Sequence, residues 1–206
     1  MDIQIKNRKL VTLVVCLIPL LWLFLDIAFG NLGSNPIQAL HIRLGDWSLR
    51  FLCITLAVTP IQMMTRWRGM SDYRQMLGLY AFFYATLHLL AYLVVDNNLM
   101  WSIIGTDIIE SPYIWFGVVA YLIVFALAIT SPKWVMKSMG KSWKKLHRLI
   151  YVSSIAAIIH YFWQLKGNLA EPLLYSIIIF FLLLFRVLLW KTRHELKEMM
   201  IPKGYE

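Results

Sequence analysis

Six long apolar segments, separated by shorter polar ones, dominate the pattern of the chain. They cover about residues 10 to 29, 47 to 65, 75 to 95, 113 to 130, 148 to 164 and 172 to 190. Each is close to the ~20 residues that a helix needs to cross the hydrocarbon core of a bilayer. A backbone in lipid has to satisfy its own hydrogen bonds, so the segments are expected to be helices. The pattern predicts an all-α membrane protein, a bundle of six transmembrane helices.

Composition agrees with this class. Of the 206 residues, 60% are hydrophobic and 15% charged, and the mean hydropathy is +0.64, above the level of a soluble domain. The first segment is too long for the core of a signal peptide and lacks a small-residue cleavage site, so it is predicted to remain as an anchor. Cys16 and Cys53 fall inside apolar segments and are expected to be free packing residues.

The basic residues alternate from one connection to the next. They collect in the N-terminal tail, the second and fourth connections and the C-terminal tail, whereas the other connections are poor in Lys and Arg. By the positive-inside rule, this distribution predicts cytoplasmic N- and C-termini. The net charge of +9 is explained by topology and by contact with membrane lipids, and no soluble region is expected to bind nucleic acid.

The connections are short, and no linker or clear repeat stands out, so residues 1 to 206 are expected to form a single transmembrane domain. Thr59-Pro60 is expected to bend or end the second helix, with the threonine hydroxyl bonding the carbonyls that proline frees. The outer segments GNLGSNPIQALHIRLGD and DNNLMWSIIGTDIIESP are expected to lie at the membrane interface, where a partner protein can dock. No Walker loop, no G-x-G-x-x-G and no C-x-x-C-H motif is present.

Three of the five histidines lie in or at the ends of apolar segments: His88, His147 and His160. An ionisable side chain in hydrocarbon is costly and marks a functional site by default. For any single histidine, the alternative is a hydrogen bond to a neighbouring helix. His41, in the first outer connection, and His194, in the C-terminal tail, are expected to be solvated. For His41, a role in partner docking or at a haem edge is the alternative.

His88 and His160 are expected at one depth in the membrane. His88 lies fourteen residues after Arg74, and His160 lies thirteen after His147, so both steps are ~20 Å along a helix. If Arg74 and His147 mark the inner edge, the other two histidines lie near the outer side. Two neutral imidazoles facing each other across a bundle suit the axial positions of a six-coordinate haem iron.

A stripe of small residues supports this interpretation and also allows another. Gly78, Ala81 and Ala85 lie between Arg74 and His88 on one face of the third helix. They leave room for a flat porphyrin, but such a stripe equally lets two helices pack closely.

The inner end of the bundle is the second candidate site. The thirteen-residue step from His147 to His160 turns the helix by ~220°, so the two histidines look toward different surroundings. Arg74 matches His147 in depth and face. A guanidinium has no free lone pair for iron but bonds well to a propionate or phosphate. His147 is therefore a candidate ligand of an inner cofactor, with Arg74 as its anion contact.

With these residues identified, the chain resembles the MsrQ (YedZ) family, the haem-binding membrane subunits of methionine sulfoxide reductase systems, within the wider ferric reductase and NADPH oxidase superfamily. The resemblance covers nearly the whole chain. It rests on the stretches GNLGSNPIQALHIRLGDWSLRFL, LAVTPI, RQMLGLYAFFYATLHLLAYL and GKSWKKLHRLIYVSSIAAIIHYFW.

The resemblance implies that His88, His147 and His160 bind b-type haem, as one or two haems, with Arg74 standing where the oxidases have a fourth histidine. It implies a multi-pass protein of the bacterial inner membrane that takes electrons from the quinone pool or a cytosolic flavin reductase. The acceptor would be a periplasmic molybdopterin-dependent reductase that repairs methionine sulfoxide in oxidised periplasmic proteins. An FMN is a further cofactor associated with the family.

Two other functions fit the same residues. One is a stand-alone cytochrome b that reacts with ferric ion or quinone, and the other is a non-redox transporter or assembly subunit with structural histidines. No residue pattern indicates a nucleophile or a general base. The chain is therefore predicted to be an electron-transfer subunit rather than the catalytic one.

Overall fold

The computed structural model describes residues 2–164 and 169–200, and all regular elements in these ranges are helices. The long ones are α1 (Asp2–Ala28), α2 (Pro36–Thr65), α3 (Ser71–Leu90), α5 (Pro112–Ile129), α8 (Ile150–Gln164) and α9 (Ala170–Met200). Three short α-helices lie in the connections: α4 (Trp101–Glu110), α6 (Lys133–Met139) and α7 (Lys141–Leu146). A π-helical segment (Ala91–Asp96) extends α3, and 3-10 turns occur at Arg68–Met70 and His147–Leu149. The prediction of an all-α protein is confirmed for the described residues.

Five helical segments of the described chain are long and apolar enough to cross a membrane. They are Lys9–Ala28, Pro36–Thr65, Tyr73–Asp96, Pro112–Ile129 and Ala170–Thr192. Five of the six predicted spans are therefore present, and the chain is a multi-pass membrane protein. The segment predicted over 148 to 164 forms α8, which has 15 residues and a length of ~22 Å, less than the ~30 Å of the hydrocarbon core. That α8 is a sixth span stays a prediction, as does the cytoplasmic side of the termini.

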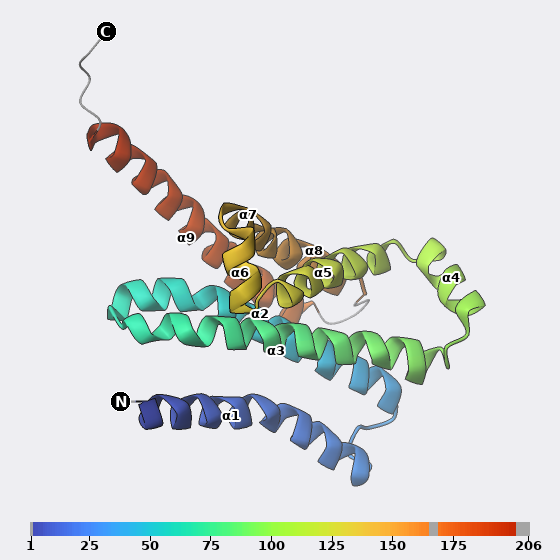
Figure 1. Ribbon diagram of the computed structural model, residues 1–206. Helices are drawn as coiled ribbons and strands as arrows, with labels where there is room; N and C mark the ends of the chain where they lie inside the picture. Colours follow the sequence, from blue (N-terminus) through green and yellow to red (C-terminus); the bar gives the residue numbers. More distant parts are fainter. Residues whose placement is uncertain (1, 165–168, 201–206) are drawn as a thin grey trace.

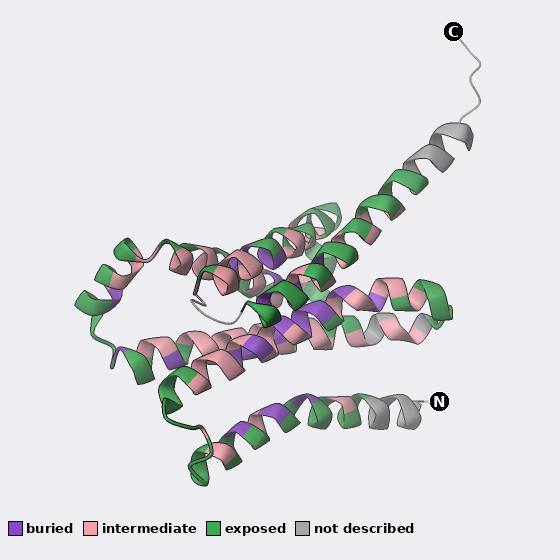
Figure 2. Ribbon diagram, turned by 180° about the vertical axis from the view of Figure 1, so that it is seen from behind, coloured by how far each residue is buried: buried purple, intermediate pink, exposed green. Residues whose placement is uncertain are grey.

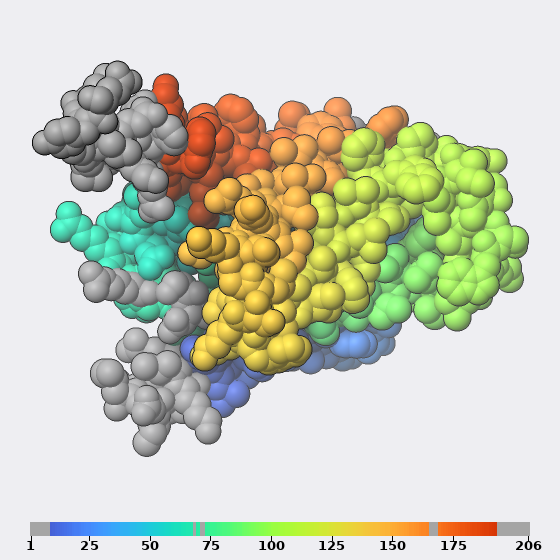
Figure 3. Space-filling model, turned by 45° about the horizontal axis from the view of Figure 1, so that its top comes forward, coloured from blue at the N-terminus to red at the C-terminus, as the bar shows by residue number. Residues whose placement is uncertain are grey.

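The helices form two antiparallel pairs, flanked by α1 and α9. The first pair is α2 with α3 and the second is α5 with α8, while α9 crosses obliquely and contacts both α2 and α8 (Figure 1). The beginning of α1, the α2–α3 connection and the end of α9 lie at one end of the bundle, which we call the basic end (Figure 1). The other end carries α4, which projects from the surface (Figure 3), and is called the α4 end.

The start of α2 differs from the prediction. The helix begins at Pro36, well before residue 47, so most of the predicted outer connection GNLGSNPIQALHIRLGD is helical. The side chain of Asn35 caps it by accepting a hydrogen bond from the backbone N–H of Gln38 at 3.1 Å. An asparagine cap followed by proline at the first position is a strong start signal for a helix.

The prediction that Thr59-Pro60 ends the second helix is wrong, and a bend at this point stays a prediction. Helix α2 continues through Pro60 to Thr65, and the buried hydroxyl of Thr59 has no hydrogen-bond partner. Proline lacks an N–H, so the carbonyl of Leu56, four residues earlier, has no donor within its helix. The Nη2 of Arg186, on α9, donates to this carbonyl at 3.0 Å. A side chain from another helix therefore compensates for the proline.

The core lies between α2 and α3. The ring of Phe51 stacks on that of Tyr84 with centroids 5.3 Å apart, and the Tyr84 hydroxyl donates to the carbonyl of Cys16 on α1 at 2.9 Å. Buried residues are concentrated along α2, whereas α1 and α9 keep exposed outer faces (Figure 2). Cys16 and Cys53 are buried and free, as predicted.

The small residues of α3 partly serve helix packing. A Cβ atom at Gly78 would lie 3.6 Å from Cγ2 of Thr55, and the carbonyl of buried Ala81 accepts a hydrogen bond from Ser48 on α2 at 2.9 Å. For Gly78 and Ala81 the structure therefore supports close packing of two helices rather than space for a porphyrin.

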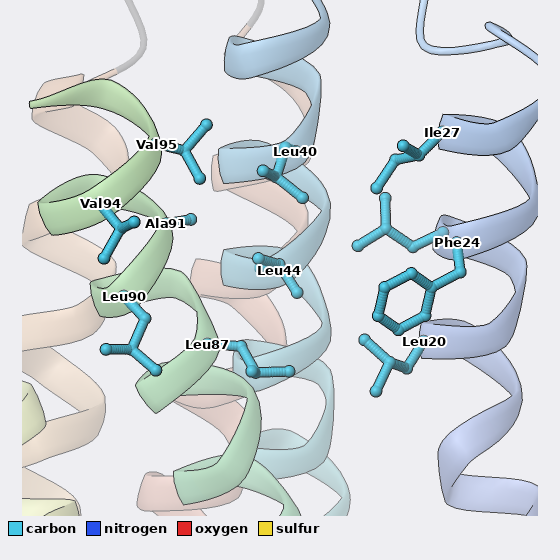
Figure 4. A pocket seen from close by; sticks show the side chains of 11 residues that line it. Leu20, Phe24, Ile27, Leu40, Leu44, Leu87, Leu90, Ala91, Val94 and Val95 are labelled. Atoms are coloured by element: carbon cyan, nitrogen blue, oxygen red, sulfur yellow. The ribbon is translucent and has the colours of Figure 1, made fainter. Parts of the chain in front are cut away.

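Helix α1 leaves an apolar cavity of about 330 Å³ between itself and the α2–α3 pair, toward the α4 end. Aliphatic side chains and one phenylalanine point into it from three sides, among them Leu20, Phe24, Leu44 and Leu87 (Figure 4). This lining is hydrocarbon throughout, so the cavity suits acyl chains rather than polar chemistry.

Candidate functional site

The structure brings together the two histidines that the sequence pairs across the bundle. The rings of His88, on α3, and His160, on α8, have centroids 6.3 Å apart and planes at 82°. A metal held by two imidazoles, at about 2.0 Å from each nitrogen, separates the ring centroids by about 6 Å. The observed spacing therefore fits one metal ion between the two rings.

Each ring is anchored through Nδ1 to a backbone carbonyl. The His88 Nδ1 lies 3.0 Å from the carbonyl oxygen of His41 on α2, and the His160 Nδ1 lies 2.8 Å from that of Tyr113 on α5. A carbonyl only accepts, so Nδ1 carries the hydrogen in both rings and the lone pair is left on Nε2. A hydrogen bond to the nitrogen that does not bind the metal fixes the orientation of a metal-binding histidine.

A glycine lies behind each ring. A Cβ atom at Gly45 would be 3.4 Å from Cε1 of His88, and one at Gly117 would be 2.8 Å from Nδ1 of His160. At Gly117 a side chain would overlap the ring, so this glycine is required for the close approach of α5 to His160. Neither glycine stands out in the sequence.

These contacts show that the α2–α3 and α5–α8 pairs repeat one structural unit. In both units the anchoring carbonyl and its histidine are 47 residues apart. A serine-to-carbonyl bond spans 33 residues in each, Ser48 to Ala81 and Ser153 to Ala120. The expectation that the chain has no clear repeat is therefore wrong. The signal is sparse: one glycine, one Thr-Pro or Ser-Pro pair and one histidine recur at a constant offset, while the apolar residues around them differ.

The expectation that His41 is solvated is wrong. Its side chain is 13% exposed and meets the His88 ring edge to face, with centroids 5.7 Å apart. Its Nε2 is buried without a hydrogen-bond partner, 3.8 Å from a carboxylate oxygen of Asp96. Because α2 starts earlier than predicted, His41 belongs to the helix that supports the histidine pair. The side chain of His194 lies outside the described residues.

At the basic end, His147 is held by two neighbours. Its Nε2 is 3.2 Å from the hydroxyl of Thr130, and its ring stacks on Trp143 with centroids 3.9 Å apart. Trp143 in turn donates from Nε1 to the Thr130 carbonyl at 2.8 Å. Burial lowers the pKa of His147, and the positive charge of Arg74 lowers that pKa further. The imidazole therefore favours its neutral form, and its pairing with Arg74 in one cofactor site stays a prediction.

The repeat pairs His147 with Gln75 rather than with Arg74. Gln75 precedes His88 by the same thirteen residues that separate His147 from His160. The amide Nε2 of Gln75 donates to the carbonyl of Ser131 at 2.9 Å. An amide is a weak partner for iron, so this end of the molecule lacks the paired imidazoles of the α4 end among the described residues.

The chemistry of the His88–His160 pair suits haem better than a bare metal ion. No group of three or more His, Cys, Asp or Glu that could hold a metal occurs within the described part of the chain. A metal at this pair would therefore take its remaining ligands from another source, as iron does from a porphyrin. The residues present fit a haem iron with two axial histidines.

Comparisons with known proteins identify the family of the chain. Residues 44–158 match the family described as ferric reductase like transmembrane component. Relatives named protein-methionine-sulfoxide reductase heme-binding subunit MsrQ include one from Rhodospirillum rubrum, 39% identical over 87% of this chain and 86% of its own. Another, from Brucella anthropi, is 40% identical over 91% of this chain and 84% of its own. A third, from Xanthomonas euvesicatoria, is 42% identical over 82% and 78%. The chain therefore belongs to the ferric reductase-like transmembrane family and, within it, to the MsrQ family.

Proposed function

We propose that this protein is a b-type haem subunit that carries electrons for a methionine sulfoxide reductase system, with His88 and His160 as the axial ligands. The observation that carries the proposal is the facing pair itself, with centroids 6.3 Å apart and each Nδ1 tied to a backbone carbonyl. The relatives are named heme-binding subunits, which supports the same cofactor.

When bound, haem supplies one-electron redox chemistry, and the protein sets its ligands and surroundings. The carbonyls of His41 and Tyr113 hold both imidazoles through Nδ1, which leaves Nε2 of each ring as the atom that would bind the iron. Two axial histidines leave no open position on iron, which favours electron transfer over reaction with oxygen.

The route of the electrons is part of the same proposal. We propose a bacterial inner-membrane protein with the basic end in the cytoplasm, where the quinone pool or a cytosolic flavin reductase donates electrons. The acceptor is a periplasmic molybdopterin-dependent reductase. Helix α4 suits its docking, because Trp101 and Ile109 are 70% and 78% exposed at that end of the molecule. His147 and Arg74 belong to an inner cofactor site, for a second haem or an FMN.

The test is to purify the protein from haem-replete cells in mild detergent, measure haem per chain and record oxidised and dithionite-reduced spectra. We expect at least one haem per chain with a low-spin b-type spectrum. Reduced protein should then be mixed with the periplasmic reductase and methionine sulfoxide, and reoxidation of the haem followed. A colourless protein would contradict the haem assignment, and haem that stays reduced would favour the stand-alone cytochrome.

A further inference from the structure

Arg186 is a cation inside an apolar span that the proposed haem pair does not use. It lies on α9 within Ala170–Thr192, a span of mean hydropathy 2.5. A charged residue at such a position is costly and is kept for a function by default. One function is visible: Nη2 donates to the Leu56 carbonyl that Pro60 leaves without a helical donor. That bond uses one of the five N–H groups of the guanidinium.

The Nε of this guanidinium is not satisfied by the protein, because it is buried and has no hydrogen-bond partner. Within the described residues, the ion pairs are His41 with Asp96, Arg43 with Asp26 and Arg50 with Asp46, so Arg186 has no carboxylate. A guanidinium inside an apolar span without an anionic partner is costly. A bound anion would remove most of this cost.

The surroundings of Arg186 add donors and a second positive charge. The hydroxyl of Thr59 is buried without a partner, one turn along α2 from the carbonyl that Arg186 contacts. Arg74 is near enough for its charge to act on Arg186 and on His147 alike. Two cations close enough for their charges to interact, and an unpaired hydroxyl one turn from the Arg186 contact, are the groups that an oxyanion site uses.

We propose that Arg186, with Arg74 and the Thr59 hydroxyl, binds the oxyanion of a cofactor resident at the basic end. The chemistry is that of a carboxylate or phosphate, supplied by a haem propionate or by the phosphate of FMN. This inference rests on the proposed function, because it places an anionic cofactor beside His147. It adds Arg186, a residue of the last helix, to the inner site that the sequence predicts from Arg74 and His147.

The experiment has to separate anion binding from the bond to Leu56. Arg186→Gln removes both. Pro60→Ala restores a backbone N–H at residue 60, which can donate to the Leu56 carbonyl four residues earlier. In the double variant Pro60→Ala/Arg186→Gln, that carbonyl is satisfied while the cation is absent. Pro60→Ala alone is the matched control, and each variant is checked for a single peak in gel filtration.

Haem and FMN per chain are measured in all four proteins, together with the midpoint potential of the haem. We expect the double variant to lose half or more of one cofactor or to show a lower potential, because removing a cation favours oxidised haem. Loss of haem identifies the propionate as the anion, and loss of FMN alone identifies the phosphate. Thr59→Val should reduce the same cofactor content or midpoint potential, but by less.

The inference is overturned if the double variant keeps wild-type cofactor content and potential, since Arg186 would then serve only the Leu56 carbonyl. The inference is also overturned if Pro60→Ala alone lowers the cofactor content or the potential as much as the double variant does. A wild-type protein without haem would instead contradict the proposed function. The two failures are therefore distinguishable in one set of purifications.

Discussion

The rings of His88 and His160 face one another across the bundle at 82°, with their centroids 6.3 Å apart. Each ring is oriented by a backbone carbonyl from the neighbouring helix of its own pair. The two halves of the repeat thus contribute one histidine each, and the proposed metal position lies on the boundary between them. A site shared in this way needs both helix pairs to be correctly packed.

The first prediction concerns these two histidines. His88→Ala and His160→Ala should each remove the low-spin b-type spectrum, because iron loses one of its two axial ligands. His147→Ala is the comparison, since His147 lies apart from the pair and is held by Thr130; it should cause partial haem loss or impaired reduction. Absorption spectra and haem per chain decide the result. Full haem content with an unchanged spectrum in both ligand variants would make the assignment wrong.

The second prediction uses the two glycines behind the rings. Gly117→Ala puts a methyl group 2.8 Å from the His160 Nδ1, whereas Gly45→Ala puts one 3.4 Å from the His88 ring. Overpacking of this kind costs about 1–3 kcal/mol, while alanine gains up to about 1 kcal/mol over glycine in a helix.

Gly117→Ala should therefore bind less haem and unfold at lower temperature, and Gly45→Ala should stay near wild type. The measurements are haem per chain and thermal unfolding in detergent. Equal behaviour of the two variants would show that the close approach to His160 does not constrain the site.

Much of the fold could be predicted from the sequence because spanning a bilayer requires long apolar helices. Five spans follow from hydropathy alone. The start of α2 could not be placed in that way, since residues 36 to 46 are mixed in polarity and their helix depends on the Asn35 cap. The repeat escaped detection because apolar positions tolerate many residues and only a few contacts have to be kept.

The site was predictable only in part. Histidines in apolar segments are visible in any sequence, and their depth follows from helix geometry. The anchoring carbonyls of His41 and Tyr113 could not be predicted, because every residue has a carbonyl whatever its side chain. The contact between Arg186 and Leu56 joins residues 130 positions apart, and nothing local to either residue indicates it.

The third prediction tests the repeat. Ser48→Ala and Ser153→Ala each remove a hydrogen bond between the two helices of a pair. Such bonds in membranes contribute about 0.6 kcal/mol on average, so each variant should unfold at a slightly lower temperature, and the double variant should show the sum. Ser176→Ala is the control, because Ser176 bonds to Pro172 within its own helix. A control that is destabilised as much as the two test variants would argue against the role of these bonds in pairing.

The fourth prediction concerns the buried carboxylate of Asp46. Its residue is 7% exposed, and Nη2 of Arg50 lies 3.8 Å from its Oδ2. Arg50 is itself held by the hydroxyl of Tyr175 on α9, to which Nε donates at 2.7 Å, and by the face of Trp47, 4.8 Å from the ring centroid. This cation therefore links α2 to α9 while compensating a charge inside the span.

Arg50→Met keeps an unbranched side chain but removes the cation, so the buried carboxylate of Asp46 keeps the hydroxyl of Tyr161 as a partner and loses its compensating charge. The expected cost is about 3 kcal/mol in the free energy of unfolding. Adding Asp46→Asn should recover most of it, because the amide carries no charge. Unfolding of both variants in detergent measures the difference. If the double variant is no more stable than Arg50→Met, the loss comes from the contacts to Tyr175 and Trp47 rather than from the uncompensated carboxylate.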